Sequence, residues 1–299
     1  MSFEIITDSA SNLTQDLLEQ YNIHMISYHV CINDKDFLCY EKDRNYEETG
    51  KKFYAAMRNG ASMKTSLVNT AQLEEMMLPF LKEGKDIMFV GISSGLSGTV
   101  SAARVAAEEL SEQYPDRTIQ IIDSVGASLG EGLMVIQMAK LRAEGKTLAE
   151  ATKYYEDNRM FMQHIFTVDD LKYLKKGGRI SAAEAAIGTL LSIKPILWAS
   201  EEGKIESLQK VRTRNKSLST LVHFVETHIT EPENQVVGIA HCDALEEANM
   251  VAEEIRKRCP VKDILIRYYD LCTGTHVGPG TIAIFFLGDD RTRPEGKTI

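Results

Sequence analysis

The sequence lacks the features that mark disulfide-rich, zinc-binding and membrane-spanning proteins. Its five cysteines are scattered, and no C-x-x-C pair occurs among them. Disulfide frameworks and zinc sites need paired cysteines at short spacing, so we interpret these five as small, buried hydrophobic residues. No apolar run is long enough to span a membrane, because Lys194 interrupts the most apolar C-terminal stretch, residues 187–198.

Positive charge is also scarce. The chain has 34 Lys and Arg residues against 43 Asp and Glu residues, a formal net charge of −9 at pH 7. This balance argues against a nucleic-acid partner and against adsorption to an anionic membrane. The first residues, MSFEIITDSA, enter a predicted strand directly and do not resemble a signal peptide. We therefore expect a cytoplasmic protein with no stable membrane insertion.

The length and the hydrophobic pattern predict an α/β protein with two domains. A chain of 299 residues is long for a single core. In the first half, apolar runs such as residues 3–7 and 86–92 alternate with segments of helical periodicity, which is typical of a mostly parallel sheet covered by helices. We predict an N-terminal α/β domain at residues 1–159 and a second α/β domain at residues 160–299.

Three local predictions concern less regular segments. Residues 23–32 have the composition of one strand, and residues 34–45 are polar and turn-like. The stretch GTHVGPG, residues 274–280, has the glycines and proline of a tight, open loop. Such loops commonly line ligands, and the His276 imidazole can donate a hydrogen bond to an anion. The alternative is a turn histidine exposed to solvent.

The stretch around which the chain is organised joins a predicted strand, residues 86–92, to a helix that starts near Val100. Between them lies SSGLSGT, residues 93–99, with two glycines and four hydroxyl side chains. Free N–H groups and the positive end of the helix dipole favour an anion there. A G-x-S-x-G nucleophile elbow is incomplete because Thr99 replaces the last glycine, and no Walker loop is present. A simple helix N-cap is an equally good interpretation.

Two further features lie on either side of Ser181, one after it and one before it. The helix predicted after it is rich in alanine, which leaves room either for a closely packed helix, the favoured interpretation, or for an elongated apolar tunnel. Arg179 follows Gly177 and Gly178 in a predicted exposed turn beside two lysines. Basic runs are usually solvated, but this one suits contact with a partner or a phosphate.

Together these stretches resemble the DegV family of bacterial fatty-acid-binding proteins, which includes the binding subunits of fatty acid kinase. The matching segments run in one order along nearly the whole chain, as far as residue 280: ITDSASNL, KTS, SSGLSGT, IIDSVGASLGEG, VDDLKYLKKGGRIS, IKPIL, KVRTR and GTHVGPG. One departure is that the family commonly continues KTS with Gln-Pro-Ser, whereas Leu67, Val68 and Asn69 follow here. We expect the loop near the head group to be shaped differently for this reason.

The resemblance implies a two-domain α/β fold with a mostly parallel sheet in the first domain, a mixed sheet in the second and a lipid pocket between them. It implies that Thr65, Ser97 and His276 hold the carboxylate of a long-chain fatty acid such as palmitate, stearate or oleate. The neighbouring residues expected to assist binding are Ser66, Ser93, Ser94, Gly98 and Thr275. Those expected to line the acyl pocket are Ala182, Ala183, Ala186 and Leu190. No metal or other cofactor is expected.

By the same resemblance, the protein is a binding subunit, not an enzyme in its own right. It is expected to present the carboxylate to a separate fatty acid kinase, through a contact that includes Arg179. The acyl-phosphate product would feed phospholipid synthesis through a phosphate acyltransferase. Two alternatives remain: a serine hydrolase that uses Ser97 and His276 with Asp8 or Asp123, and a regulatory module that senses lipid.

Overall fold

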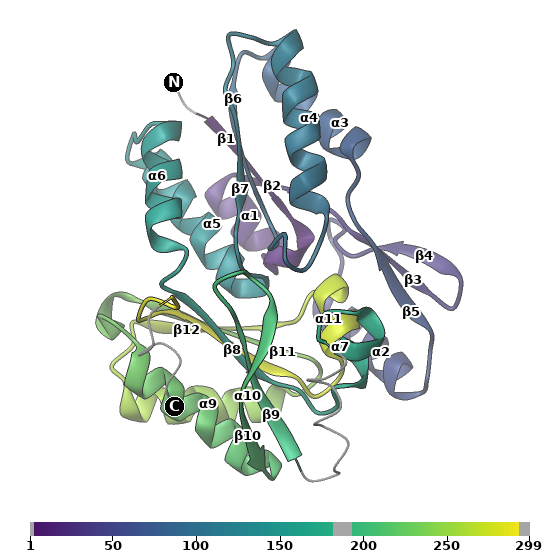
Figure 1. Ribbon diagram of the computed structural model, residues 1–299, viewed down its shortest axis with the longest axis vertical. Coiled ribbons are helices and arrows are strands. Elements are labelled where there is room, and N and C mark those ends of the chain that lie inside the picture. Colours follow the sequence, from purple (N-terminus) through teal and green to yellow (C-terminus); the bar gives the residue numbers. More distant parts are fainter. Residues whose placement is uncertain (1–2, 182–192, 293–299) are drawn as a thin grey trace.

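The structure is a computed structural model that describes residues 3–181 and 193–292. The strands described there form a four-stranded, a six-stranded and a three-stranded sheet. In Figure 1 the four-stranded sheet and its helices form the upper layer, and the six-stranded sheet forms the lower one. The helix predicted after Ser181, with Ala182, Ala183, Ala186 and Leu190, lies outside the described residues.

The four-stranded sheet is parallel throughout, as the β/α alternation predicts. Its strand order is β2-β1-β6-β7. The strands are β1 (Phe3–Asp8), β2 (Ile23–Ile26), β6 (Asp86–Gly91) and β7 (Ile119–Asp123). Its helices are α1 (Gln15–Tyr21), α3 (Thr70–Lys82), α4 (Thr99–Gln113), α5 (Ser128–Ala143) and α6 (Leu148–Asn158). Figure 1 shows α3 and α4 on one side of the sheet and α1, α5 and α6 on the other. Both central strands are therefore almost entirely buried.

The six-stranded sheet is mixed, in the order β10-β9-β8-β13-β11-β12, and only its β11–β12 pair is parallel. Its strands are β8 (Met162–Thr167), β9 (Ile193–Ala199), β10 (Ile205–Arg212), β11 (Val236–His241), β12 (Asp263–Tyr268) and β13 (Ile282–Leu287). The helices α9 (Arg214–His228) and α10 (Leu245–Arg258) cover one face, and the short 3-10 helix η2 (Pro232–Asn234) precedes β11.

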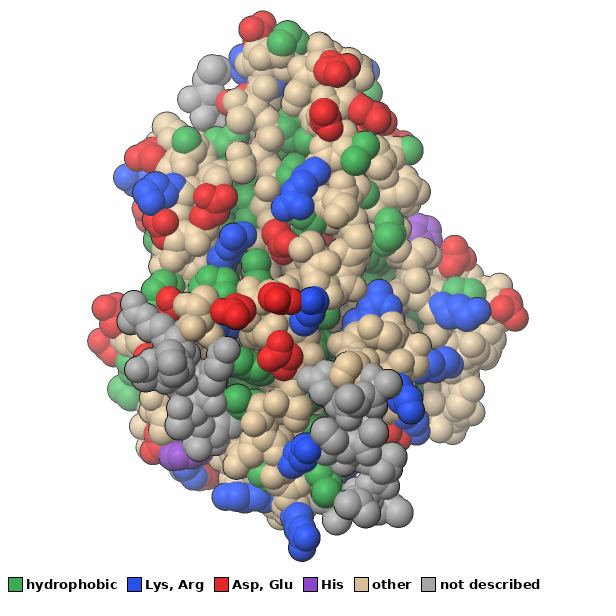
Figure 2. Space-filling model, in the orientation of Figure 1, with side chains coloured by type: hydrophobic (Ala, Val, Ile, Leu, Met, Phe, Trp, Pro, Cys, Tyr) green, Lys and Arg blue, Asp and Glu red, His purple; other side chains and the backbone are tan. Residues whose placement is uncertain are grey.

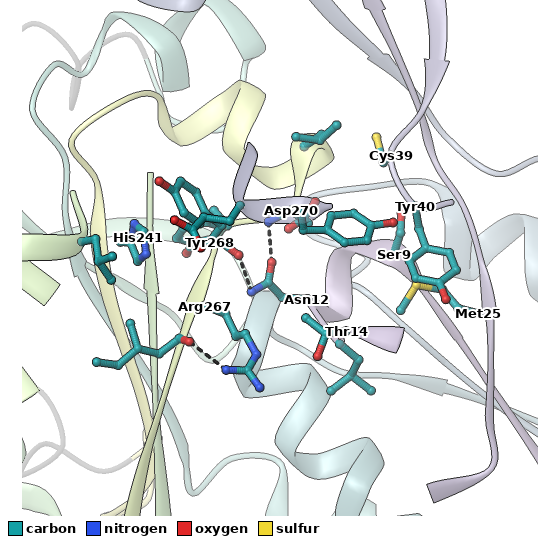
Figure 3. A pocket seen from close by; sticks show the side chains of 17 residues that line it. Ser9, Asn12, Thr14, Met25, Cys39, Tyr40, His241, Arg267, Tyr268 and Asp270 are labelled. Carbon is teal, nitrogen blue, oxygen red and sulfur yellow. Dashed lines mark hydrogen bonds between the residues drawn. The ribbon is translucent and has the colours of Figure 1, made fainter. Parts of the chain in front are cut away.

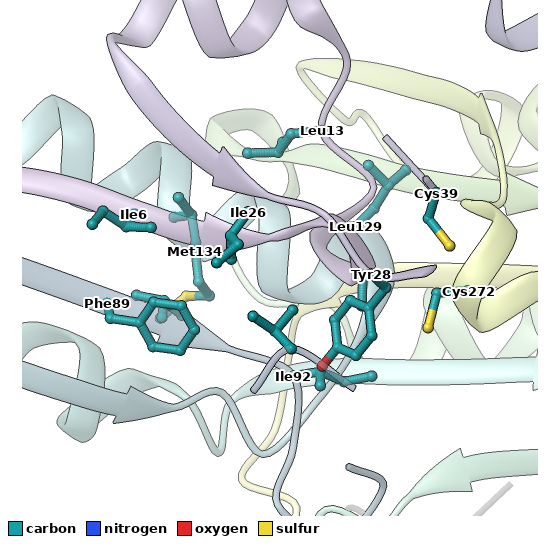
Figure 4. Close-up of a cluster of buried hydrophobic side chains, with 14 of the residues drawn as sticks. Ile6, Leu13, Ile26, Tyr28, Cys39, Phe89, Ile92, Leu129, Met134 and Cys272 are labelled. Carbon is teal, nitrogen blue, oxygen red and sulfur yellow. The ribbon is translucent and has the colours of Figure 1, made fainter. Parts of the chain in front are cut away.

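Alternate residues of the six-stranded sheet enter two different cores. Ile239 and Ile284 pack with α9 and α10 in one apolar cluster. Their neighbours Ala240 and Phe285 join a second cluster, which extends into the parallel sheet. Successive side chains of a strand point to opposite faces, so one sheet supplies both cores. The shared cluster packs the two layers directly against each other, and Figure 4 shows part of it.

The prediction of one strand at residues 23–32 is wrong, because the chain leaves the parallel sheet after Ile26. The turn at Ser27 and Tyr28 is held by the Tyr28 N–H, which donates to the Ser9 hydroxyl over 3.0 Å. After the turn, β3 (His29–Ile32) enters the antiparallel sheet β4-β3-β5 with β4 (Lys35–Leu38) and β5 (Met63–Ser66). The strands on both sides of the turn are mainly apolar, so their pattern alone does not mark the break.

The prediction of a turn-like segment at residues 34–45 is wrong in part, because β4 occupies residues 35–38. A two-residue turn at Asn33 and Asp34, with φ of 47° and 63°, connects it to β3. Both positive φ values suit asparagine and aspartate and match the twist of a tight hairpin. The polar composition reflects the exposure of β4, whose four residues are all exposed.

The prediction of a loop at residues 274–280 is also wrong for its first half. His276 lies in the last turn of α11 (Leu271–Val277), which is capped by Asp270 and ends at Gly278, with φ of 81°. Gly274 lies inside this helix, at a position where a Cβ would come within 2.1 Å of the Tyr54 hydroxyl. Tyr54 belongs to α2 (Tyr46–Arg58), so this glycine permits close helix packing instead of an open turn.

Hydrogen bonds of Asn12 fix the start of α11 relative to the parallel sheet. Asn12 follows the 3-10 helix η1 (Ser9–Ser11) at the end of β1. Its side-chain amide donates to the backbone carbonyl of Tyr268 over 2.9 Å, and its side-chain oxygen accepts from the Asp270 N–H. Both bonds are drawn in Figure 3, beside a separate cavity of about 280 Å³. Within the described residues, no helix has both the length and the apolar character needed to cross a membrane.

Candidate functional site

Two neighbouring cavities share a wall made of Thr65, Arg179 and His276. The smaller has a volume of about 150 Å³, and its lining includes apolar side chains from both halves of the chain. These apolar residues are Leu67, Ile92, Leu96, Ile205 and Val277. The larger has a volume of about 760 Å³, and basic side chains line it together with the shared wall. These are Arg58, Lys64, Lys172 and Lys176. The shared residues therefore separate an apolar cavity from a basic one.

Thr65 and His276 meet in this wall. Thr65 lies on β5 and His276 on α11, and the Thr65 hydroxyl is 2.8 Å from Nε2 of His276. Burial, followed by the nearby Arg179 charge, lowers the pKa of His276 to about 4, so the imidazole is neutral at pH 7. Its Nδ1 is buried without a hydrogen-bond partner among the described residues.

Gly177 explains why the imidazole can sit so close to the short helix α7 (Lys172–Gly177). A Cβ at residue 177 would lie 2.2 Å from Nδ1 of His276, well inside van der Waals contact. Only glycine leaves room for the ring at this point. The glycine pair before Arg179 therefore has a packing role in the site, in addition to ending the helix.

Ser97 is held by two other hydroxyl groups. It lies in the turn between β6 and α4 and lines the smaller cavity. Its Oγ is 3.2 Å from the Tyr28 hydroxyl and 3.1 Å from Oγ1 of Thr99. The Tyr28 hydroxyl also donates to Oγ1 of Thr99 over 2.6 Å. Three hydroxyl groups thus form one connected cluster at the edge of the cavity.

A buried carboxyl group lies behind these hydroxyls. Asp8 ends β1, and its two oxygens accept hydrogen bonds of 2.9 Å from the N–H groups of Ala10 and Ile92. The Tyr28 hydroxyl is 3.4 Å from Oδ2 of Asp8. Burial raises the pKa of Asp8 to about 7 despite these hydrogen bonds, since desolvation penalises the charged form.

The structure brings together some of the sequence-predicted residues and leaves others outside. Gly98 lines the smaller cavity with Thr65, Ser97 and His276, and Thr275 lines the larger one. The others, Ser66, Ser93 and Ser94, do not belong to either lining. Ser93 is buried and donates to the Gly203 carbonyl over 2.9 Å, which shapes the loop. The acyl-pocket candidates Ala182, Ala183, Ala186 and Leu190 lie outside the described residues.

Arg179 differs from its predicted position in an exposed turn. It is partly buried, and its Nε donates to the Leu96 carbonyl over 3.2 Å. Its guanidinium also donates to the Gly177 carbonyl. These bonds hold the charged group in the wall that both cavities share. The residues around Arg179 in the sequence do not reveal its bond to Leu96, because Leu96 belongs to a distant part of the chain.

A Ser–His–Asp triad does not emerge from the described residues. The hydrogen bonds of Ser97 there go to Tyr28 and Thr99, and His276 bonds Thr65. Within residues 3–181 and 193–292, Nδ1 of His276 has no carboxylate to orient it. A hydrolytic triad needs a base hydrogen-bonded to the nucleophile and a third group that orients the base.

Tyr28 and Thr99 are site residues that the sequence reasoning does not single out as ligand-binding. Tyr28 falls inside the segment predicted as one strand, where an aromatic residue raises no question. Thr99 stands out in the sequence only as the residue that breaks the nucleophile-elbow pattern. Its 0% exposure and its short bond to Tyr28 are consequences of the tertiary fold.

Comparison with known proteins identifies the family. The family model described as "Uncharacterised protein, DegV family" matches residues 2–289. This chain belongs to the DegV family. A DegV domain-containing protein of Clostridium perfringens is 40% identical over 289 residues, which cover 97% of this chain and 98% of the relative. A Clostridium acetobutylicum relative is 33% identical over 293 residues, which cover 98% of this chain and 100% of the relative.

Solved structures of DegV proteins share the fold. A fatty-acid-binding DegV family protein from Thermus thermophilus is 26% identical, with a TM-score of 0.84. DegV from Bacillus subtilis, described as a fatty acid binding protein, is 27% identical, with a TM-score of 0.82. Each similarity covers 97% of this chain and 100% of the relative. The two-sheet α/β fold predicted from the sequence is thereby confirmed as the DegV fold.

Proposed function

We propose that this DegV protein binds a long-chain fatty acid, with the carboxylate at Thr65, Ser97 and His276 and the acyl chain in apolar surroundings. The observation that carries the proposal is the convergence of these three residues on one cavity from β5, the β6–α4 turn and α11. The solved DegV relatives that are described as fatty acid binding proteins support the same ligand class.

The chemistry of the cavity suits a carboxylate attached to an apolar chain. Hydroxyl groups can donate to a carboxylate, and hydrogen bonds to a charged acceptor are stronger than neutral ones. With Nε2–H donating to the Thr65 oxygen, the Thr65 proton is free to point into the cavity. Burial of each acyl CH₂ group then adds about 0.8 kcal/mol to the affinity.

The cavity lies where the two halves of the chain meet, in keeping with a lipid site between domains at residues 1–159 and 160–299. Tyr28, Thr65 and Ser97 come from the first half, and Ile205 and His276 come from the second. A ligand held by both halves would add contacts between them. The extent of the acyl pocket is part of this proposal. So is the assignment of its lining to Ala182, Ala183, Ala186 and Leu190.

The finer part of the proposal is that the bound carboxylate is presented to a separate kinase for conversion to acyl-phosphate, for use in phospholipid synthesis. The basic cavity supports this, since it adjoins the head-group residues and suits the anionic phosphates of a donor nucleotide. In Figure 2, Lys and Arg side chains gather on this face near α7 and β5, although the whole chain carries a net charge of −9. Arg179 is the residue we assign to this contact.

Native mass spectrometry of the purified protein tests the binding function. A bound species with the mass of a palmitate, stearate or oleate, removable with organic solvent and restored by added fatty acid, supports the proposal. A protein that neither retains nor rebinds any of the three overturns it. Covalent capture of Ser97 by a fluorophosphonate would instead favour a hydrolase.

A second experiment tests presentation to the kinase. A fatty acid kinase catalytic subunit, ATP and the loaded protein should yield acyl-phosphate, trapped as the hydroxamate. The Arg179→Ala variant, loaded to the same extent, should form less product at limiting kinase concentration. Equal product formation by both proteins would remove Arg179 from the contact. If neither protein yields product, presentation to the kinase is refuted and only the fatty-acid-binding function remains.

A further inference from the structure

Tyr28 is a buried phenol whose single hydroxyl group has three polar neighbours. Only 2% of its surface is exposed, and Figure 4 shows it beside Ile92 within the apolar cluster shared by the two layers. The hydroxyl oxygen is 2.6 Å from Thr99, 3.2 Å from Ser97 and 3.4 Å from Asp8. It therefore connects a buried carboxyl group to the hydroxyls at the cavity edge.

The number of available protons restricts how these groups are bonded. A phenol has one proton, so Tyr28 cannot donate to Asp8 and to Thr99 at the same time. If Asp8 is ionised, it draws the phenol proton, and the phenol oxygen then accepts from Thr99 or Ser97. A Ser97 hydroxyl that donates inward to Tyr28 has no proton left for a ligand in the cavity.

If Asp8 carries a proton, each hydroxyl group can donate outward, toward the cavity. Asp8 donates to Tyr28, Tyr28 donates to Thr99 over the shortest of these distances, and Thr99 donates to Ser97. The Ser97 proton is then free to point into the cavity. This arrangement supplies a donor where a carboxylate needs one, and no proton has to be shared.

We propose that Tyr28 is a positioning residue, which transmits a hydrogen bond from protonated Asp8 through Thr99 so that Ser97 donates to the ligand carboxylate. The inference rests on the proposed fatty-acid function and adds to it that the ligand binds together with a proton held on Asp8. Its consequence is that affinity falls as rising pH removes that proton.

The surroundings of Asp8 favour the protonated form. The titratable groups that face it are Tyr28, Glu131 of α5, and Asp270 and Cys272 of α11. Asp270 opposes a negative charge on Asp8, whereas a hydrogen bond from Tyr28 stabilises that charge, and none of the four groups is a cation. Burial raises the pKa of Asp8 to about 7, and a bound carboxylate nearby adds a further negative charge that raises it again. The proton is therefore available at neutral pH.

A double-mutant cycle tests the relay, with oleate as the probe in isothermal titration calorimetry. We expect Tyr28→Phe to raise the Kd for oleate about tenfold, the loss of one hydrogen bond to a charged group. Adding Tyr28→Phe to Ser97→Ala should then have little further effect, because the relay acts through Ser97. The matched control is Tyr54→Phe, which removes another buried hydroxyl, bonded to the Tyr269 carbonyl over 3.1 Å, and should leave the Kd unchanged.

The pH profile provides a readout that a purely structural role would not change. For the wild type, the Kd for oleate should rise between pH 6 and pH 8, and the rise should be smaller for Tyr28→Phe. If Tyr28→Phe fails to fold, Thr99→Val keeps the side-chain shape, breaks the relay and should have the same effects.

Unchanged affinity in folded Tyr28→Phe, or parallel pH profiles in the two proteins, would overturn the relay. So would additive losses in the Tyr28→Phe and Ser97→Ala double variant. These outcomes leave the proposed function intact as long as Ser97→Ala weakens oleate binding. A wild-type protein that does not bind oleate, palmitate or stearate would instead overturn the function and the relay together.

Discussion

The Thr65 hydroxyl and Nε2 of His276 lie 2.8 Å apart, although 211 positions separate the two residues in the chain. The contact joins the antiparallel sheet to the end of α11, next to the apolar cavity. Because burial keeps the imidazole neutral at pH 7, one ring nitrogen can donate to Thr65 and leave the Thr65 proton for a ligand. Neutral hydrogen-bonding groups from both halves of the chain therefore form the head-group site.

Removal of a single head-group donor should weaken fatty-acid binding without unfolding the protein. We expect Thr65→Val and Ser97→Ala each to cost about 1.5–3 kcal/mol of binding free energy, the value of a hydrogen bond to a charged group. His276→Ala should also weaken binding, because Thr65 loses the N–H that leaves its own proton free for the ligand. Titration calorimetry with oleate measures the change. Ser101→Ala is the control, because Ser101 is exposed on α4 and should leave the Kd unchanged. Wild-type affinity in all three variants would remove the carboxylate assignment.

A methyl group at Gly177 should damage the site through His276. Gly177→Ala places a Cβ about where Nδ1 of His276 makes its closest approach, so the ring must move. We expect this overpacking to cost about 1–3 kcal/mol of folding free energy and to displace His276 from the head-group site. The oleate Kd should rise accordingly. At neighbouring Gly178, with φ of 72°, an added Cβ meets no atom within 4 Å. Gly178→Ala should therefore strain the backbone but spare binding, and equal effects on the Kd would contradict this account.

The basic cavity should contribute to catalysis by the kinase more than to lipid affinity. Lys176 is exposed and lines this cavity, but it is absent from the lining of the smaller one. We expect Lys176→Ala to lower acyl-phosphate formation about two- to tenfold at limiting kinase, because a charge at the rim acts mainly on association. The effect should shrink at high salt. Lys153→Ala, at an exposed position of α6, is the control, and a loss equal to that of Lys176→Ala would refute a localised contact.

His276 should make the folded state less stable as the pH falls. Its pKa is lowered from 6.5 to about 4 in the folded protein, so the unfolded chain takes up a proton first. Stability from this group is present above pH 6.5 and is lost as the pH falls toward 4. Between pH 7 and pH 5 the loss should be of the order of 1–2 kcal/mol.

Urea unfolding at the two pH values, for the wild type and for His276→Gln, isolates this contribution. The variant should lose less stability than the wild type on acidification. Asp8 has a raised pKa and shifts stability in the opposite direction, but it does so in both proteins and cancels in the comparison. Identical losses in the two proteins would show that His276 does not titrate in this way.

Local sequence patterns are sufficient for most elements and for part of the site. The apolar runs at residues 3–7 and 86–92 coincide with the central strands β1 and β6, because strands buried on both faces need apolar residues throughout. The hydroxyl-rich residues 93–99 lie at the carboxyl end of β6, as predicted. Helix α6 is missing from the sequence-based prediction, although its capping box of Thr147 and Glu150 is a readable signal.

The sequence by itself determined the parallel sheet, the family and the residue types of the head-group site, because periodicity and motifs are local properties. Only the tertiary structure decided that the chain turns at Tyr28, that His276 lies on a helix and that Arg179 bonds Leu96. These relationships depend on which distant segments pack together, and that depends on strand order and on close contacts such as the one at Gly177. A pattern of neighbouring residues reports burial, whereas a binding site is made by residues that folding alone brings together.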